Sequence, residues 1–302
     1  MEVFNFAICA LLLMFFSTHT AYTADVLSSD PSVSSQVEDF LASDPASGTS
    51  IPCVLLHCLK YSAACLLDSN CRTYMECSQK CMNGWGNDTT PGKFHVQNCT
   101  SKCSFSYGDE TIENFMSCVT ENNCVSFPSI PSPCKKVQPL KQIPVEDLKG
   151  SWWVVRGYHP VFDCYPCAHP NFEPINATMW SYNPNYLTYL VNETLKPVHM
   201  HFEMPYQPPG EGIPFVYHDM GLDHYKTWWI IDEAVDKSYI LLYYCGNTLQ
   251  WYYEGSIVLA RNLTLSEEAY ADIAVSYQKA VGLNLTSFCD ARTSNCPDWS
   301  II

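Results

Sequence analysis

Basic side chains are scarce in this sequence. Lysine and arginine together number 16, against 31 aspartates and glutamates, and the formal net charge is −15 at pH 7. Binding to a nucleic-acid backbone needs clustered Lys and Arg, and the chain has no such cluster. The composition therefore argues against nucleic acid as a partner. The acidic residues are scattered, which indicates a solvated acidic surface.

Long apolar runs are missing beyond the N-terminus. Residues 6–16 are apolar but too short to cross a membrane, so residues 1–23 are predicted to be a signal peptide, although its first residues lack Lys and Arg. Residues 24–50, rich in Ser, Asp, Ala and Pro, are predicted to form a flexible acidic leader. We expect no transmembrane segment after removal of the signal, with at most transient contact with a membrane.

The cysteines and sequons indicate an oxidising compartment. Loss of the signal peptide removes Cys9 and leaves 16 of the 17 cysteines, an even number that favours disulfides over a metal site. Asn-x-Ser/Thr sequons predict glycosylation. They begin at Asn87, Asn98, Asn176, Asn192, Asn262 and Asn284. We predict a secreted or endomembrane-lumen glycoprotein, with the plastid lumen, reached through a signal-peptide route, as the alternative.

Residues 51–126 are predicted to form a small, disulfide-rich helical domain. Cys77 and Cys81 are spaced i, i+4, as are Cys99 and Cys103, so each pair lies on one helix face. Two antiparallel helices would then form the bonds Cys77–Cys103 and Cys81–Cys99. Each bond would contribute roughly 2–4 kcal/mol to a segment with few large apolar residues.

The same antiparallel arrangement predicts the remaining bonds of this domain. They are Cys53–Cys71, Cys58–Cys65 and the local pair Cys118–Cys124. Zinc is the alternative, but zinc sites usually contain Cys-x2-Cys knuckles, which this segment lacks. The twin Cys-x3-Cys spacing also resembles the helical hairpins of small mitochondrial chaperones, and the signal peptide and sequons argue against that interpretation.

Residues 127–146 are rich in proline and are predicted to form an extended linker. Residues 147–262 alternate between strand-like runs and turn signals. About eight antiparallel strands in this length predict an up-and-down barrel, which removes exposed edges and can hold a ligand. The predicted strands are Trp152–Gly157, Ala177–Tyr182, Tyr186–Val191, Val198–Met204, Phe215–His218, Thr227–Ile231, Tyr239–Cys245 and Ser256–Ala260.

Residues 263–302 are predicted to form a helix and a tail that a disulfide ties back. Thr264 and Glu267 match a Thr-x-x-Glu capping box, an apolar stripe begins at Tyr270, and Gly282 ends the helix. The fold class is therefore mainly β: a barrel with a C-terminal helix, preceded by the helical domain.

Several of these features together resemble the violaxanthin de-epoxidase family. They are the cysteine ladder from Cys53 to Cys124, Gly150-Ser-Trp152, Phe162-Asp163 with Cys167, Tyr217-His218-Asp219 with His224-Tyr225, Tyr243-Tyr244, and the helix with Cys296. The family is a lipocalin-fold plastid enzyme that uses ascorbate to remove epoxide oxygens from xanthophylls at acidic pH. The resemblance covers about residues 53–299.

The resemblance implies a lipocalin-like eight-stranded antiparallel barrel whose Trp152 packs against Arg261 at one end. It implies a carotenoid or lipid as partner, ascorbate as co-substrate if the chain is an enzyme, and a bond between Cys167 and Cys296. Four cysteines have no counterpart in the family, and their pairing stays open. They are Cys134, Cys164, Cys245 and Cys289.

The chain differs from the family at two motif aspartates that are candidates for the catalytic chemistry. The family motif is His-Tyr-x-Asp-Asp-Trp, and its first aspartate is a candidate proton donor. The corresponding residues here are His224-Tyr225-Lys226-Thr227-Trp228-Trp229. We interpret Thr227 as the position that lost the carboxylate. A second family aspartate is replaced by Pro166.

Reductive opening of an epoxide needs a protonated acid, a reductant and a long apolar pocket. A carboxylic acid inside an apolar barrel has a raised pKa and can be that acid. The catalytic candidates are Asp163, Asp219, His218 and Tyr244, with Asp223 as a further carboxyl. Turn and strand-end positions are the plain alternative for each aspartate.

The ligand-binding candidates are aromatic residues of the later strands. They are His224, Tyr225, Trp229 and Tyr243. Their alternative role is ordinary barrel core. Cys164 and Cys167 have thioredoxin-like spacing but lack the strand-to-helix context of a redox motif.

Two functions follow. The chain is either a de-epoxidase-like oxidoreductase with ascorbate or a secreted, non-catalytic lipocalin that carries or senses a hydrophobic ligand.

Overall fold

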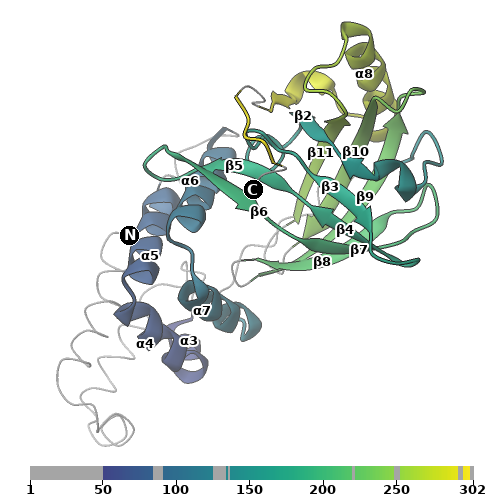
Figure 1. The fold of residues 1–302 in the computed structure, drawn as a ribbon. Helices are drawn as coiled ribbons and strands as arrows, with labels where there is room; N and C mark the ends of the chain where they lie inside the picture. The colour runs from purple at the N-terminus through teal and green to yellow at the C-terminus, as the bar shows by residue number, and fades with distance from the viewer. Residues whose placement is uncertain are drawn as a thin grey trace, which may run out of the picture.

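A computed structural model describes residues 50–83, 91–124, 134, 137–219, 222–247, 252–291 and 295–299. The predicted signal peptide and leader, the sequon at Asn87 and most of residues 125–136 lie outside this range. Five helices form one part of the described chain and an antiparallel barrel with a C-terminal helix forms the other (Figure 1). None of the described helices is long and apolar enough to cross a membrane.

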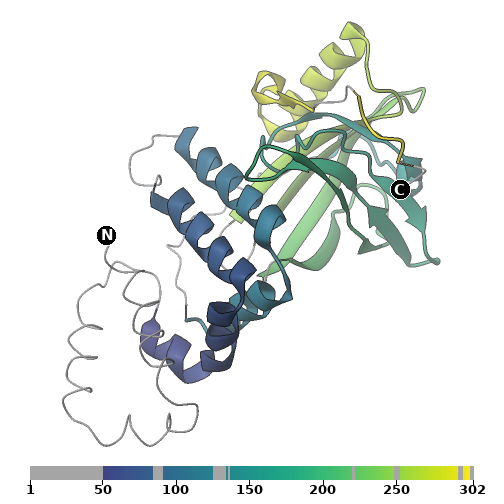
Figure 2. The ribbon, with the colours of Figure 1, turned by 60° about the vertical axis from the view of Figure 1, so that its left-hand side comes forward.

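The helical part comprises five helices. They are α3 (Ile51–His57), α4 (Leu59–Leu67), α5 (Ser69–Asn83), α6 (Pro91–Tyr107) and α7 (Glu110–Glu121). Helices α5 and α6 run antiparallel, as Figure 2 shows, and carry the predicted bonds Cys77–Cys103 and Cys81–Cys99. Helix α7 begins at Asp109, whose carboxylate accepts hydrogen bonds from the backbone N–H groups of Thr111 and Ile112.

The other three predicted bonds of this part are wrong. The structure pairs Cys53–Cys124, Cys58–Cys118 and Cys65–Cys71, in place of Cys53–Cys71, Cys58–Cys65 and Cys118–Cys124. The reason is α7, which buries Ile112 and Val119 against the cysteines of α3, α4 and α5. The prediction paired the first four cysteines with one another and did not take α7 into account.

Two sheets wrap into the barrel. Their orders are β1-β3-β4-β7 and β12-β2-β11-β10-β9-β8, with every pair antiparallel. Their strands are β1 (Gly150–Ser151), β2 (Trp153–Gly157), β3 (Asn171–Pro174), β4 (Met179–Asn183), β7 (Phe202–Pro205), β8 (Ile213–Asp219), β9 (Leu222–Glu233), β10 (Tyr239–Asn247), β11 (Tyr252–Ala260) and β12 (Cys289–Asp290). Because β1 and β2 are consecutive, they join the two sheets as one strand. Apart from β12, a two-residue strand that pairs with β2, the result is a lipocalin-like eight-stranded barrel.

The prediction missed β3 and misjudged the ribbon that follows. The predicted strand Val198–Met204 is split between β6 (Leu195–His199) and β7, and β5 (Asn185–Tyr189) continues from β4 after Pro184. Proline has no N–H for the ladder, so the long hairpin divides there into a barrel part and a β5–β6 extension. The extension contacts α6, where Lys102 pairs with Glu193 at 2.5 Å.

Helix α8 (Glu267–Val281) packs on the outer face of the barrel (Figure 1). It buries Ile273 and Tyr277 against outward side chains of β10 and β11. Its N-cap is Ser266, whose hydroxyl accepts from the N–H of Ala269 at 3.2 Å, so the predicted capping by Thr264 is wrong. Gly282 ends the helix with a φ of +77°, as predicted.

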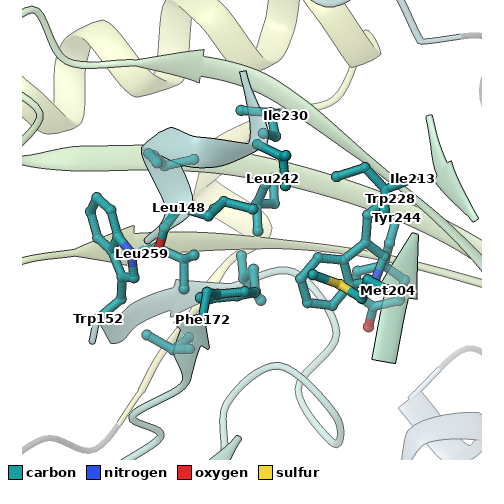
Figure 3. Close-up of a cluster of buried hydrophobic side chains, with 14 of the residues drawn as sticks. Leu148, Trp152, Phe172, Met204, Ile213, Trp228, Ile230, Leu242, Tyr244 and Leu259 are labelled. Carbon is teal, nitrogen blue, oxygen red and sulfur yellow. Dashed lines mark hydrogen bonds between the residues drawn. The ribbon is translucent and has the colours of Figure 1, made fainter. Parts of the chain in front are cut away.

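One end of the barrel is closed by Trp152, at the left of Figure 3. Its ring is fully buried, and its Nε1 donates to the carbonyl of Leu148 in the 3-10 helix η2 (Val145–Leu148) at 2.6 Å. The Arg261 guanidinium lies 3.5 Å from the ring centroid and donates to the carbonyls of Lys149 and Ser151. The expected contact between Trp152 and Arg261 is therefore present.

Three further disulfides tie the barrel to its flanking segments. They are Cys134–Cys245, Cys164–Cys289 and the expected Cys167–Cys296. The four cysteines left open by the sequence thus pair among themselves. Two of these bonds anchor the chain after α8 to the loop that follows β2.

Candidate active site in the barrel

Alternation along β9 decides which of its side chains face the barrel interior. Trp228 is buried among interior rings, with its ring centroid 4.9 Å from that of Tyr182. Lys226 lies over the interior ring of Tyr244, so Lys226 and Trp228 both point inward. The intervening Thr227 belongs to the opposite, outward face of the strand.

Asp163 is the buried carboxyl of the interior, with 5% of its surface exposed. Its Oδ1 accepts a hydrogen bond from the Tyr244 hydroxyl at 2.6 Å. Its Oδ2 accepts from the backbone N–H groups of His159 at 2.8 Å and Ser256 at 3.2 Å. Both carboxyl oxygens are therefore held in place, and the group is presented to the barrel by the loop after β2.

Two glycines make room for this pair. A Cβ on Gly157 would lie 2.4 Å from the Cβ of Asp163, and a Cβ on Gly255 would lie 2.2 Å from Cζ of Tyr244. Gly255 is the partner of Tyr244 across the β10–β11 ladder. Larger residues at either position would displace the pair.

Burial raises the pKa of Asp163 from its usual 3.8 to about 6. The hydrogen bonds from Tyr244, His159 and Ser256 and the charge of Lys226 act in the other direction and keep the pKa from rising further. Burial and the charge of Asp163 also raise the pKa of Tyr244 well above its usual value. Near pH 6 the site can therefore hold or release a proton at Asp163 while Tyr244 stays protonated.

A second polar group lines the same wall. The His224 ring stacks on Tyr217 with centroids 4.5 Å apart, and its Nδ1 lies 3.4 Å from the hydroxyl of Tyr253. Burial, aided by the charges of Lys226 and His218, lowers the pKa of His224 to about 4. This imidazole is therefore neutral over most of the physiological pH range.

His218 lies at the rim, where β8 meets the helical part. Its Nδ1 is 3.0 Å from Asp223, and its Nε2 is 3.6 Å from Glu113 and 3.4 Å from the Ser117 hydroxyl, both on α7. Within the described residues, the partners of His218 are these three side chains and not Asp163. The contacts of His218 therefore do not support its predicted catalytic role. The side chain of Asp219 lies outside the described residues.

The predicted ligand-binding residues divide between the two faces of the barrel wall. His224 is on the interior wall, but Tyr243 and Trp229 belong to the cluster beneath α8, with their ring centroids 6.0 Å apart. Tyr225 is exposed and lines, with Thr227, a groove of about 620 Å³. Tyr225, Trp229 and Tyr243 therefore lie outside the barrel interior, because consecutive strand residues alternate between faces, and Trp229 lines the same groove as Tyr225.

Alternation also decides where Thr227 lies. This residue, which stands where the family motif has its first aspartate, points outward, whereas its neighbour Lys226 faces the interior. Lys226 and the interior tyrosines 217 and 253 were missed as site residues. The period-2 alternation of a strand places Lys226 on the same face as Trp228, and this signal could have identified Lys226 as an interior residue.

No cysteine of the site is a free thiol, since Cys164 and Cys167 are both in disulfides. Cys77, Cys81 and Cys103 form the sole metal-like cluster within the described residues, and each of them is disulfide-bonded. Five sequon asparagines are described and all are exposed. They are Asn98, Asn176, Asn192, Asn262 and Asn284.

Comparisons with known proteins agree with this architecture. Residues 50–293 match the family model described as VDE lipocalin domain. Chloroplastic violaxanthin de-epoxidase from Nicotiana tabacum is 26% identical over 82% of this chain and 51% of its own length, and the Arabidopsis thaliana protein is 24% identical over 80% and 52%. The chain thus spans about half the length of the curated relatives it matches.

Among solved structures, two lobster crustacyanins align with low scores. Apocrustacyanin A1 is 15% identical with a TM-score of 0.39, covering 55% of this chain and 96% of its own. H1 crustacyanin from Homarus americanus is 14% identical with a TM-score of 0.41, covering 57% and 96%.

Proposed function

The chain belongs to the violaxanthin de-epoxidase lipocalin family, and from this premise we propose that it binds a carotenoid or another long apolar ligand in its barrel. We further propose that Asp163 is the proton donor of an ascorbate-dependent reductive de-epoxidation at acidic pH. The observation that supports the proposal is the buried Asp163 carboxyl, which is bonded to Tyr244 and has a pKa of about 6.

The residues fit the first requirement of this chemistry, a positioned acid. In this reaction both C–O bonds of the epoxide break, a C=C double bond forms and the oxygen leaves as water after it has taken up two protons. Ascorbate supplies the two electrons and is oxidised to dehydroascorbate. Asp163 is protonated below about pH 6, and Tyr244 holds one of its oxygens at 2.6 Å. The barrel interior contains buried aromatic rings such as Phe172 and Trp228, which give it the apolar character that a polyene ligand needs.

The second candidate is a non-catalytic carrier of a hydrophobic ligand. Thr227 favours it, because this chain has a threonine where the family motif has the aspartate that is its candidate proton donor. The disulfides and exposed sequons are compatible with a secreted or endomembrane-lumen glycoprotein. A plastid lumen is the alternative compartment, since the curated relatives are named chloroplastic.

Turnover of violaxanthin with ascorbate, measured at about pH 5 and about pH 7.5 on either side of the Asp163 pKa, separates the two. The enzyme hypothesis predicts de-epoxidation at the lower pH that is lost in Asp163→Asn and kept in Asp272→Asn, the matched control on the exposed face of α8. Asp219→Asn tests the other predicted acid. Binding of the pigment without turnover at either pH would contradict the enzyme hypothesis and support the carrier hypothesis. Failure to bind any apolar ligand would contradict both hypotheses.

A further inference from the structure

The disulfide Cys164–Cys289 lies directly beside the buried acid. Cys164 is the residue after Asp163, and the bond joins it to a cysteine 125 positions later in the chain. Cys289 begins β12, where it is the ladder partner of Gly157 at the end of β2. The bond therefore ties the loop that presents Asp163 to a strand that the barrel itself holds.

Gly157 is the residue on which both the acid and the disulfide pack. A Cβ on Gly157 would lie 2.4 Å from the Cβ of Asp163, so the loop lies directly on the glycine backbone. The sulfur atoms of Cys289 and Cys164 lie 3.2 Å and 3.6 Å from the carbonyl oxygen of the same glycine. A movement of the disulfide would therefore reach Asp163 both through the chain and through this shared contact.

The strand β12 is itself well supported. Phe288, the residue before Cys289, is buried and packs edge-on against Tyr277 of α8, with ring centroids 4.9 Å apart. Asp290, the residue after it, forms an ion pair with Arg156 of β2. Because both of its neighbours are fixed, Cys289 can anchor the loop.

Hydrogen bonds secure the other side of the loop. The backbone N–H of Asp163 donates to the carbonyl of His159 at 2.8 Å, and its Oδ2 accepts from the N–H of His159. The N–H of Tyr158 donates to the carbonyl of Ser256 on β11 at 2.8 Å. These bonds attach Asp163 and the residues before it, whereas the disulfide attaches the residue after it.

We propose that the disulfide Cys164–Cys289 is a positioning element for Asp163, which it holds against Gly157 so that both carboxyl oxygens keep their hydrogen-bond donors. The proposal rests on the proposed function, in which Asp163 is the proton donor. Burial is the largest cause of the raised pKa of Asp163. Both cysteines are half-buried, so a loop released from this anchor would admit water to the carboxyl and return its pKa toward the usual value.

The test removes the bond and follows the ionisation of Asp163 directly by NMR. The chain is labelled at the carboxyl carbon of aspartate, and the Asp163 signal is identified by its absence from Asp163→Asn. In the wild type this signal should titrate at about pH 6. In Cys164→Ser/Cys289→Ser, which leaves neither cysteine unpaired, the midpoint should fall by about one pH unit or more, which is a loss of about tenfold or more in proton affinity.

Cys65→Ser/Cys71→Ser is the matched control, since it removes one disulfide from the helical part of the chain. It should leave the midpoint of Asp163 unchanged. Cys164→Ala/Cys289→Ala serves as a second pair if the serine pair does not fold, as judged by its thermal melt.

The outcomes separate this inference from the proposal beneath it. A midpoint of Asp163 that does not change when the Cys164–Cys289 bond is removed would overturn the positioning role. An equal fall in the control would also overturn it, because the effect would then belong to the loss of any disulfide. Turnover of violaxanthin, measured on the same proteins, tests the proposed function separately. A wild type without turnover, together with a shifted titration in the serine pair, would contradict catalysis and support the positioning role.

Discussion

Ionisation of the buried Asp163 should destabilise the protein as the pH rises. Its pKa is about 6 in the folded chain, against the usual 3.8. Between these values the folded state keeps a proton that the unfolded state has released, so the contribution is fully present below about pH 4 and is lost as the pH rises through about 6. A shift of about 2 pKa units, at about 1.4 kcal/mol per unit, corresponds to about 3 kcal/mol.

Asp163→Asn removes this titration and keeps the size of the side chain. The free energy of unfolding is measured by urea for wild type and variant, with disulfides intact, at steps from about pH 4 to about pH 7.5. His224 acts in the opposite sense, because its pKa is lowered from 6.5 to about 4 and its contribution is lost as the pH falls. The difference between the two proteins is therefore the informative quantity, since it cancels His224.

We expect the stability of wild type minus that of Asp163→Asn to fall by about 3 kcal/mol over this range, with a midpoint between about pH 4 and about pH 6. Asp272→Asn, on the exposed face of α8, controls for the loss of one negative charge. Parallel curves for wild type and Asp163→Asn would refute the reasoning. They would mean that Asp163 titrates alike in the folded and unfolded chains.

Three other measurements follow from the same structure. Tyr244→Phe removes the hydrogen bond that lowers the pKa of Asp163. In this variant, the stability difference with and without Asp163→Asn should therefore have its midpoint at a higher pH. The free energy of unfolding should also fall by roughly 1–3 kcal/mol. Arg261→Ala should lower the free energy of urea unfolding by roughly 1–3 kcal/mol, because it removes two bonds to carbonyls and the cation over the buried tryptophan ring. Proteolysis without reduction, followed by mass spectrometry, should yield a peptide that joins Cys58 to Cys118, and a Cys58–Cys65 peptide would contradict the bond we describe.

The sequence was informative where a local pattern decides the structure. The i, i+4 spacing of Cys77 and Cys81 fixes a helix face, and its match in the partner helix leaves one nested pairing. The period-2 runs of β10 and β11 are long enough to identify strands without any tertiary information. Gly282 could be assigned as the end of α8 because a left-handed residue there favours glycine.

The sequence was uninformative where a distant element decides. Cys53 and Cys58 pair with cysteines on and after α7, and nothing in their own neighbourhood encodes the approach of that helix. The strand β3 is short and carries no β-branched residue, so its assignment depends on its pairing with β4. Asp163 looked like a turn residue, and only the fold brings the Tyr244 hydroxyl, 81 positions later, within 2.6 Å of it.

The site on β9 shows how a motif can mislead even when its residues are correctly identified. Side-chain direction in a strand changes with every residue, so a comparison that is offset by one position exchanges the two faces. The family pattern His-Tyr-x-Asp-Asp-Trp matches His224 to Trp229 without a gap, so Thr227 and Trp228 stand where the family has its two aspartates. Since Trp228 is fixed inside by its packing on Tyr182, alternation along β9 turns Thr227 outward and Lys226 inward. The inward face of this strand therefore has a tryptophan, Trp228, where the family motif has its second aspartate, and it carries the positive charge of Lys226.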